Sequence, residues 1–158
     1  MAVMPSAPSL NMLTPHSAPY WMPAIFFRRN EADHTDMNLH SINQLLHMQL
    51  PGASLSLQEL PACKPLVLYL LQGGFDDSQL DQATIERISD DPPYWIFCWA
   101  SGHALAGKIL RGEIDVRKKT VVDFGAGSGV VAIAAALAGA EVMTCEIDPV
   151  GNHLIALN

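Results

Sequence analysis

Two acidic side chains and three glycines near the end of the sequence have the types and the spacing of a nucleoside-binding site. Asp123 stands at the end of an apolar run, and the turn that follows carries Gly125, Gly127 and Gly129. Glycines in such a turn let the backbone bend tightly and let a ligand approach without meeting a Cβ atom. Glu146 follows Gly125 by 21 residues, at the end of the next apolar run. A carboxylate there can accept hydrogen bonds from both hydroxyls of a ribose.

Two classes of nucleoside cofactor compete for this turn. A dinucleotide site needs the spacing G-x-G-x-x-G, but Val130 stands where the third glycine of that motif belongs. Asp123 would also repel a pyrophosphate, whereas S-adenosylmethionine carries a sulfonium and an ammonium and no phosphate. These residues favour the methyl donor over NAD. Two alternatives stay open: Asp123 as an acid that only shapes the turn, and Glu146 as a solvated strand end.

A second run whose side chains could bind a ligand lies just upstream. It is PPYWIFCWASG (residues 92–102), which contains Tyr94, Trp95, Phe97 and Trp99. Aromatic faces attract a cation such as a sulfonium by about 0.5–2 kcal/mol, and they help to keep a transfer site dry. We therefore expect this run and the glycine turn to border one cofactor pocket. Burial in the core is the alternative for these rings, and we prefer it for Phe97 and for the neighbouring Cys98.

The elements that position the two acids follow from the hydrophobic pattern of the last forty residues. KTVVDF (119–124) predicts a buried strand, and VVAIAAALAGA (130–140) predicts a helix that is apolar on every face and packed against a sheet. EVMTCEI (141–147) predicts the next strand. Asp148 is expected to cap a further helix with Pro149 at its first position. Strand, turn, helix and strand make a βαβ unit with an expected right-handed crossover.

Five further elements are predicted before this unit from apolar spacing and cap residues. They are a helix capped by Asn38 and running through Leu46, a strand over residues 54–60 and a strand over 65–71, a helix through Ile85 and Ile88, and a helix capped by Ser101 and ended by Gly112.

Changes in composition divide the chain into three parts. We expect residues 1–37 to be a disordered or non-native extension, 38–90 an N-terminal α/β segment, and 91–158 the start of a cofactor-binding domain. The extension contains five prolines, and it has no acid as far as Asn30. A transit peptide is one alternative for it, and translated sequence ahead of a true start near Met37 is another.

Composition and charge exclude several classes of function. Sixteen acids against nine bases give a net charge of −7, which would repel a phosphate backbone, so we expect no nucleic-acid partner. The apolar runs predict no membrane span. The three cysteines have no C-x-x-C spacing and the six histidines are scattered, so we expect reduced thiols in a cytoplasmic protein and no metal site.

Two runs of this sequence resemble motifs of a known family. VVDFGAGSGVVAIAAALAGA followed by CEIDP is similar to the first two motifs of the seven-stranded, class I methyltransferases. DPPYWIFCWASGHALAGKIL, immediately ahead of them, resembles the lysine methyltransferases of the electron-transfer-flavoprotein beta subunit and their ribosomal-protein relatives. The likeness is strong over residues 91–158 and loose over 39–88.

The resemblance implies a fold, a cofactor and roles for particular residues. The implied fold class is α/β, a Rossmann-like class I methyltransferase sheet that is incomplete here, with a first βαβ unit and an N-terminal helical and strand segment. S-adenosylmethionine would be held at its methionine part by Asp123 and the glycine turn, and at its ribose by Glu146. Trp99, Ser101 and Gly102 would lie over the donor pocket, and Trp95 would support them.

Three hypotheses about function follow. The first is a protein-lysine N-methyltransferase whose partner is a protein with a target lysine, such as the flavoprotein beta subunit or a ribosomal protein. Its compartment would be the cytoplasm, or the mitochondrial matrix if the source is eukaryotic. The second is an NAD(P)-binding oxidoreductase domain. The third is a non-catalytic fragment that binds a partner through an open sheet edge, since a complete sheet would need on the order of 100 further residues.

We name no catalytic residue from the sequence. Lysine methylation depends mainly on positioning and desolvation rather than on a covalent intermediate, and no side chain is marked as a general base. His103 lies in the relevant helix, and we interpret it as a surface or supporting residue.

Overall fold

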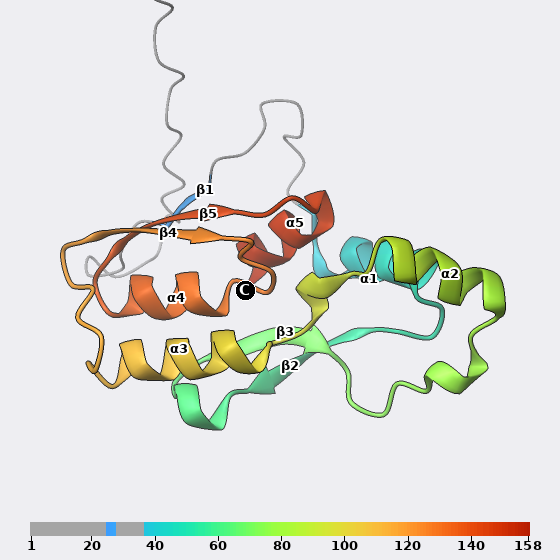
Figure 1. The fold of residues 1–158 in the computed structure, drawn as a ribbon, viewed down its shortest axis with the longest axis horizontal. Helices are drawn as coiled ribbons and strands as arrows, with labels where there is room; N and C mark the ends of the chain where they lie inside the picture. The colour runs from blue at the N-terminus through green and yellow to red at the C-terminus, as the bar shows by residue number, and fades with distance from the viewer. Residues whose placement is uncertain (1–24, 28–36) are drawn as a thin grey trace, which may run out of the picture.

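The computed structural model describes residues 25–27 and 37–158, which form a mixed α/β structure with two separate sheets. Three parallel strands make the first sheet in the order β1–β5–β4, and two antiparallel strands, β2 and β3, make the second. The strands are β1 (Ile25–Phe27), β2 (Leu55–Glu59), β3 (Val67–Leu71), β4 (Thr120–Phe124) and β5 (Glu141–Cys145). The α/β class predicted from the sequence is therefore observed (Figure 1).

The predicted unit of strand, turn, helix and strand is present at the C-terminal end of the chain. Helix α4 (Val130–Leu137) connects β4 to β5, which pair in parallel from Thr120 opposite Glu141 to Phe124 opposite Cys145. Figure 1 shows α4 between this sheet and α3 (Ala100–Leu110). The small residues of α4 allow this close packing on two sides, because its alanines at 132, 134, 135 and 136 are all buried. The prediction of a helix sandwiched against a sheet is confirmed.

A hydrophobic core joins the β2–β3 hairpin to the α3–α4 layer. Leu68 and Leu70 of β3 lie in one cluster with Ala106 of α3 and with Val130 and Ala134 of α4. Apolar side chains on one face of the hairpin thus pack directly against the helices that cover the parallel sheet. The two sheets share this core although their strands do not pair.

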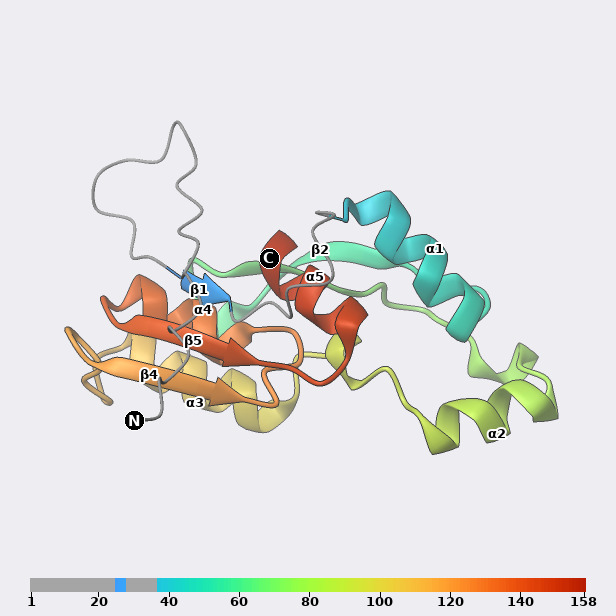
Figure 2. The ribbon, with the colours of Figure 1, turned by 90° about the horizontal axis from the view of Figure 1, so that it is seen from above.

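A second core lies under the helices at the other end of the molecule. Ile42 and Leu46 of α1 (Leu39–Gln49) pack with Trp95, Ile96 and Leu154. Leu154 belongs to α5 (Pro149–Leu157), which contacts both α1 and the 3-10 turn η3 (Tyr94–Ile96). Helix α2 (Gln82–Asp90) lies further out, as Figure 2 shows.

Two predicted caps agree with the structure, and α2 has a cap that was not predicted from the sequence. Asn38 caps α1 by accepting from the Ser41 N–H at 3.0 Å, and Asp148 caps α5 by accepting from Val150 and Gly151. Helix α2 begins after Asp81, which accepts from the Thr84 N–H at 2.7 Å. An Asx side chain satisfies an N–H that the first turn of a helix leaves unpaired.

The cap predicted for α3 is wrong. This helix begins at Ala100, with Trp99 as the N-cap residue and without a side-chain cap hydrogen bond. Ser101 lies one residue inside the helix and is exposed. A serine that precedes an apolar helical pattern indicates a cap only when the backbone turns at that residue, and here it turns two residues earlier.

The expectation that β4 is buried is also wrong. Its residues alternate, with Val121 and Asp123 partly buried and with Val122 and Phe124 exposed by 57% and 89%. Figure 2 looks onto this sheet with α3 and α4 behind the strands, and none of the described helices lies over β4 on the near side. An apolar run predicts a strand buried on both faces only when layers cover both faces, and here one layer does so within the described residues.

Strand β1 falls within residues 1–37, the part predicted as a disordered or non-native extension. It pairs in parallel with β5, with Ile25 opposite Val142. Residues 1–24 and 28–36 lie outside the described part of the chain, so the expectation for the extension stays a prediction. Among the helices that the structure describes, none combines the length and the hydropathy needed to cross a membrane.

Candidate functional site

The glycine turn lies at the carboxyl ends of two neighbouring parallel strands. It follows β4 directly, and the N–H groups of Gly125 and Ala126 donate to the carbonyl oxygen of Cys145 at the end of β5, at 2.8 and 3.1 Å. Gly125, Gly127 and Gly129 have φ values of 71°, 54° and 78°. This region of backbone space is costly for residues with a Cβ, so the three glycines are required by the turn itself.

Glu146 is tied to the glycine turn by a direct hydrogen bond. Its Oε2 accepts from the Gly127 N–H at 2.7 Å, and its Oε1 accepts from the Asp148 N–H at 3.0 Å. Both bonds fix the carboxylate at the end of β5, beside the turn. Each carboxylate oxygen can accept a further hydrogen bond, so Glu146 can still receive hydroxyl donors from a ligand.

Asp123 faces the start of α4 and is partly withdrawn from water. Its Oδ2 accepts from the Ala132 N–H at 3.0 Å. Burial raises the pKa of this carboxyl above its usual range, the Ala132 hydrogen bond opposes that shift, and the negative charge of Glu146 adds to it. Two carboxylates therefore act on the same small region. A cation placed there would be stabilised by both charges.

One side of the turn is open and the other is closed. A Cβ atom added at Gly125 would meet nothing within 4 Å, and this residue is exposed. A Cβ added at Gly127 would lie 4.0 Å from the Cα of Trp95. A ligand thus has access to the backbone at Gly125, while Trp95 covers the turn at Gly127.

Trp95 links the aromatic run to the residues that follow β5. Its ring is buried, and its Nε1–H donates to Asp148 Oδ2 at 2.8 Å. The approach is close at Gly151, where an added Cβ would lie 3.0 Å from Glu146 Cγ and 3.1 Å from Trp95 Cβ. Asp148 therefore caps α5, as predicted, and in addition holds the indole. The resemblance implies that Trp95 supports the residues over the donor pocket; its contacts described here are with Gly127, Asp148 and Gly151, and that supporting role stays a prediction.

The other aromatic rings form a separate, exposed group. Trp99 is 51% exposed, and it meets Tyr94 and Phe97 edge-on, with ring centroids 5.6 and 5.4 Å apart. Its Nε1–H donates to the Tyr94 carbonyl oxygen at 3.1 Å. The run thus divides into Trp95 on the side of the glycine turn and Trp99 on the solvent side. Phe97, for which we preferred burial, is 39% exposed.

The remaining predicted pocket residues lie in the first turn of α3. Ser101 is exposed, and Gly102 faces the start of α4, where an added Cβ would lie 3.0 Å from Val130 Cγ1. Gly102 therefore permits the close approach of α3 to the helix that follows the glycine turn. The roles of Trp99, Ser101 and Gly102 over a donor pocket stay predictions.

One residue of the site region was not singled out from the sequence. Asn158 accepts from the Tyr69 N–H at 2.7 Å and donates to the Ser128 carbonyl oxygen at 3.0 Å. It thus connects α5 to the edge of the hairpin and to the glycine turn at once. Its contacts join residues that are 89 and 30 positions away, so the sequence carried no signal for them.

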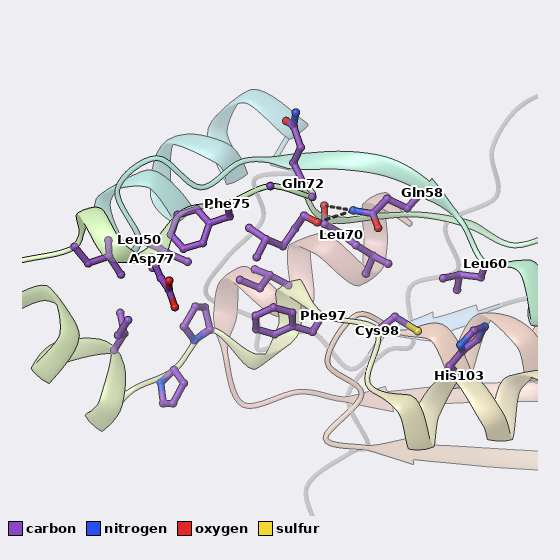
Figure 3. A pocket seen from close by; sticks show the side chains of 18 residues that line it. Leu50, Gln58, Leu60, Leu70, Gln72, Phe75, Asp77, Phe97, Cys98 and His103 are labelled. Carbon is purple, nitrogen blue, oxygen red and sulfur yellow. Dashed lines mark hydrogen bonds between the residues drawn. The ribbon is translucent and has the colours of Figure 1, made fainter.

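A groove of about 700 Å³ lies on the other side of the aromatic run (Figure 3). Phe97, Cys98 and His103 form one wall, and the end of β3 with the residues after it forms the opposite wall. None of the residues of the glycine turn lines it. The Gln58 side-chain amide donates to the Leu71 carbonyl oxygen at 2.6 Å and so fixes part of that opposite wall.

Two findings concern metal and thiol chemistry in the described residues. No three His, Cys, Asp or Glu side chains are placed there to hold a metal ion. Cys63, Cys98 and Cys145 are free thiols. Burial raises the pKa of the Cys63 and Cys98 thiols, which reduces their reactivity.

Comparison with known proteins shows that part of this chain is similar to methyltransferases. Residues 108–156 match the family of ribosomal protein L11 methyltransferase (PrmA). The chain is 42% identical over 67 residues to the electron transfer flavoprotein beta subunit lysine methyltransferases of Mus musculus and of Homo sapiens. The protein of the same description in Danio rerio is 45% identical over 68 residues. In each case the match covers 42% of this chain and 26% of the relative.

The chain thus spans about a quarter of the length of the curated relatives that it matches. No solved structure matches the chain. The two motifs, the glycine turn with its two acids and the sequence relationship agree, and the resemblance stated from the sequence is confirmed: over its matched part, this chain is similar to the lysine methyltransferases of the electron transfer flavoprotein beta subunit and to the PrmA methyltransferases.

Proposed function

We propose that this chain is part of an S-adenosylmethionine-dependent protein-lysine N-methyltransferase. The observation that carries the proposal is the hydrogen bond of 2.7 Å between the Gly127 N–H and Glu146 Oε2. It brings the glycine turn after one strand and the acid after the next strand into one site at the carboxyl edge of a parallel sheet. This is the edge at which open α/β sheets bind ligands.

The residues of the site fit the chemical groups of the methyl donor. Glu146 has acceptor capacity left for the two ribose hydroxyls. Asp123, close enough to Glu146 for their charges to interact, favours a cationic ammonium or sulfonium. Gly125 leaves open space at the backbone. In this proposal β4, α4 and β5 form the start of a Rossmann-like methyltransferase sheet, and Trp99, Ser101 and Gly102 lie on the donor side of α3.

The reaction needs an uncharged lysine amine aligned with the methyl group. The bound donor supplies that methyl on a sulfonium; a C–N bond forms as the S–C bond breaks, and the amine proton passes to solvent. This chain's contribution is binding and orientation: Glu146 and the glycine turn hold one end of the donor, and Asp123 holds its charged part. Positioning of this kind accounts for a large share of the barrier reduction in group transfer.

The acceptor is proposed to be a lysine of another protein. The names of the relatives support this, because they describe methylation of the electron transfer flavoprotein beta subunit and of ribosomal protein L11. Either partner is a proposal for this chain. A cytoplasmic or, in a eukaryote, mitochondrial-matrix location is likewise proposed, and the three free thiols are consistent with a reducing compartment.

The two alternatives have less support. An NAD(P)-linked oxidoreductase domain would place a pyrophosphate beside Asp123 and Glu146, against two carboxylates. A protein that acts only through partner binding at the edge of β4 would have no need for an acid bonded to the glycine turn. The site chemistry favours the methyl donor over both.

Calorimetric titration of S-adenosylmethionine into the 158-residue chain tests the proposal, with NADH titrated under the same conditions. We expect micromolar binding of the methyl donor and none of NADH. Glu146→Ala should abolish donor binding, because a charge-assisted hydrogen bond contributes about 1.5–3 kcal/mol and two ribose hydroxyls would lose their acceptor.

Glu141→Ala is the matched control, because Glu141 is an exposed acid at the opposite end of the same strand. It should bind the donor as the unaltered chain does. Unchanged donor affinity in Glu146→Ala, or tight NADH binding without a response to the methyl donor, would contradict the proposal.

A further inference from the structure

The groove beside the aromatic run has the composition of a site for a side chain that is apolar along its length and cationic at its end. Its walls are mostly aliphatic and aromatic, and its charged lining residue is Asp77. Neither lysine nor arginine lines the groove.

The segment that contains Asp77 of the groove is strongly acidic. Residues 76–91 contain six of the sixteen acids of the chain and a single base, Arg87. These acids are exposed, and the ion pairs described, Arg111–Glu113 and Arg117–Asp115, leave them unpaired within the described part of the chain. They are Asp76, Asp77, Asp81, Glu86, Asp90 and Asp91.

The one base in this segment, Arg87, offsets only part of its charge: it interacts with Asp81 and also donates to the end of α1. The Arg87 guanidinium donates to the Gln49 carbonyl oxygen at 3.0 Å, at the C-terminal end of α1. The negative potential of the segment over residues 76–91 is therefore largely uncompensated, and a cationic partner is favoured there.

The stretch from Trp95 to His103 borders both the groove and the proposed donor site. Phe97, Cys98 and His103 line the groove, and between them in the sequence stand Trp99, Ser101 and Gly102. Earlier in this stretch, Trp95 contacts the residues beside Glu146 through its hydrogen bond of 2.8 Å to Asp148. A chain bound in the groove would thus run beside the donor site.

We propose that this groove is the docking surface for the basic, lysine-containing segment of the protein substrate. The apolar walls hold aliphatic side chains and lysine stems, and Asp77 with the acidic segment over residues 76–91 attracts the ammonium groups. This inference rests on the proposed function, since it assigns the substrate-binding surface of that enzyme. It commits to a basic and partly apolar peptide, and an acidic peptide would be repelled.

The test uses the 158-residue chain and a fluorescein-labelled ten-residue peptide of alanine and leucine with three lysines. A matched peptide carries glutamates in place of the lysines. Fluorescence anisotropy without methyl donor should show binding of the lysine peptide, at least tenfold tighter than the glutamate peptide and weakened by salt. Equal affinities for the two peptides would overturn the proposal.

Two variants locate the binding. Asp77→Lys should weaken the lysine peptide about tenfold, because one attraction of exposed charges is lost and one repulsion is gained. Glu141→Lys makes the same charge change on β5, away from the groove, and should have less than a twofold effect. In heteronuclear NMR spectra the lysine peptide should shift the amide signals of Gly73 and Gly74 but not that of Gly139. The proposal fails if both variants weaken binding equally or if the shifts lie elsewhere.

A donor titration separates this inference from the proposed function. Asp77→Lys should bind S-adenosylmethionine as the unaltered chain does. Donor binding without any preference for the lysine peptide would overturn the docking surface and leave the methyltransferase proposal standing. Specific binding of the lysine peptide at Gly73 and Gly74 without donor binding would support the surface and contradict the methyltransferase proposal.

Discussion

At the scale of single residues, the negative charge of Asp123 disfavours folding but favours the binding of a cationic ligand. Its pKa is raised chiefly by burial, so its charged form is less favourable in the folded chain than in the unfolded one. The negative charge of Glu146 adds to this effect. A cation at the site would relieve both contributions, because it would neutralise the carboxylates where they are held. The unfavourable free energy of holding these two charges in the folded chain is thus reduced when a cationic ligand binds.

The raised pKa gives a prediction with a definite sign. The folded pKa lies above the unfolded value of about 3.9, so the stability linked to this carboxyl is fully present below the unfolded pKa and is lost as the pH rises through the folded pKa. Asp123→Asn should abolish that loss, since the amide oxygen can still accept from Ala132. Urea unfolding between pH 4 and pH 7 should show the variant gaining stability relative to the unaltered chain as the pH rises.

The same substitution should weaken the binding of S-adenosylmethionine about tenfold or more, because a charged partner of the donor is removed. Stability and binding would then change in opposite directions. A variant that is less stable at pH 7 than at pH 4, relative to the unaltered chain, would show that Asp123 is stabilising when ionised and that the argument from burial is wrong.

At the scale of elements, the contact between α5 and η3 fixes the positions of Glu146 and Asp148. Gly151 is buried in the first turns of α5. Because it has no side chain, Trp95 and Glu146 can pack directly against the helix backbone at this position. The helix could not dock so closely with a larger residue at this position. Trp95, Asp148 and Glu146 are therefore positioned by the absence of one methyl group.

Gly151→Ala should destabilise the fold by about 1–3 kcal/mol, because the added methyl would lie 3.0–3.2 Å from Glu146 Cγ and from two atoms of Trp95. The sign is informative, since alanine in a helix interior is otherwise favoured over glycine by about 1 kcal/mol. Urea denaturation measures the change.

Gly73→Ala is the control for this prediction. Nothing lies within 4 Å of a Cβ added there, and its φ is not in the left-handed region. Its unfolding free energy should stay within about 0.5 kcal/mol. A Gly151→Ala variant that is as stable as the unaltered chain would mean that α5 can shift away from Trp95 without loss.

Local patterns in the sequence predicted most elements because each depends on neighbouring residues. The run from Lys119 to Ile147 predicted β4, α4 and β5, and Asn38 and Asp148 predicted caps that are observed. The cap at Ser101 failed because Trp99, which lacks a capping oxygen, occupies that position. Burial of β4 failed because hydrophobicity does not report whether a second layer is present.

The candidate site was predictable in its members but not in its internal bonds. Asp123, the glycines and Glu146 were identified because parallel strands bring their carboxyl ends together. The bond from Gly127 to Glu146 and the bonds of Asn158 to Tyr69 and Ser128 depend on tertiary geometry. The groove is built from residues between Leu50 and His103, which meet only after the hairpin packs on α3, so no local pattern could indicate it.

At the scale of the whole molecule, one face of the parallel sheet is apolar and uncovered by the described helices. Val122 and Phe124 point to this face, and their cross-strand neighbours Met143 and Cys145 are only partly buried. Strand β4 also stands at the end of the described sheet order, with β5 as its partner. Exposed apolar surface beside an open strand edge favours association.

Phe124→Ser should lower the binding of a fluorescent hydrophobic dye and reduce self-association, which sedimentation velocity would measure at several protein concentrations. The unfolding free energy should change by less than about 0.5 kcal/mol, because the ring is 89% exposed. Leu57→Ser is the matched control, since Leu57 is 58% exposed on the hairpin and not on this sheet. Equal effects of the two changes would mean that the face of β4 is not the site of association.

The acidic segment over residues 76–91 also has a kinetic consequence. Its acids are exposed, and the segment includes α2, which lies at the outer part of the molecule (Figure 2). A long-range field of this kind raises the rate at which an oppositely charged partner arrives, and it acts before any contact forms. Salt would then slow arrival while leaving the lifetime of the finished complex almost unchanged. This segment would in this way set the association rate of a basic partner and not the lifetime of the complex.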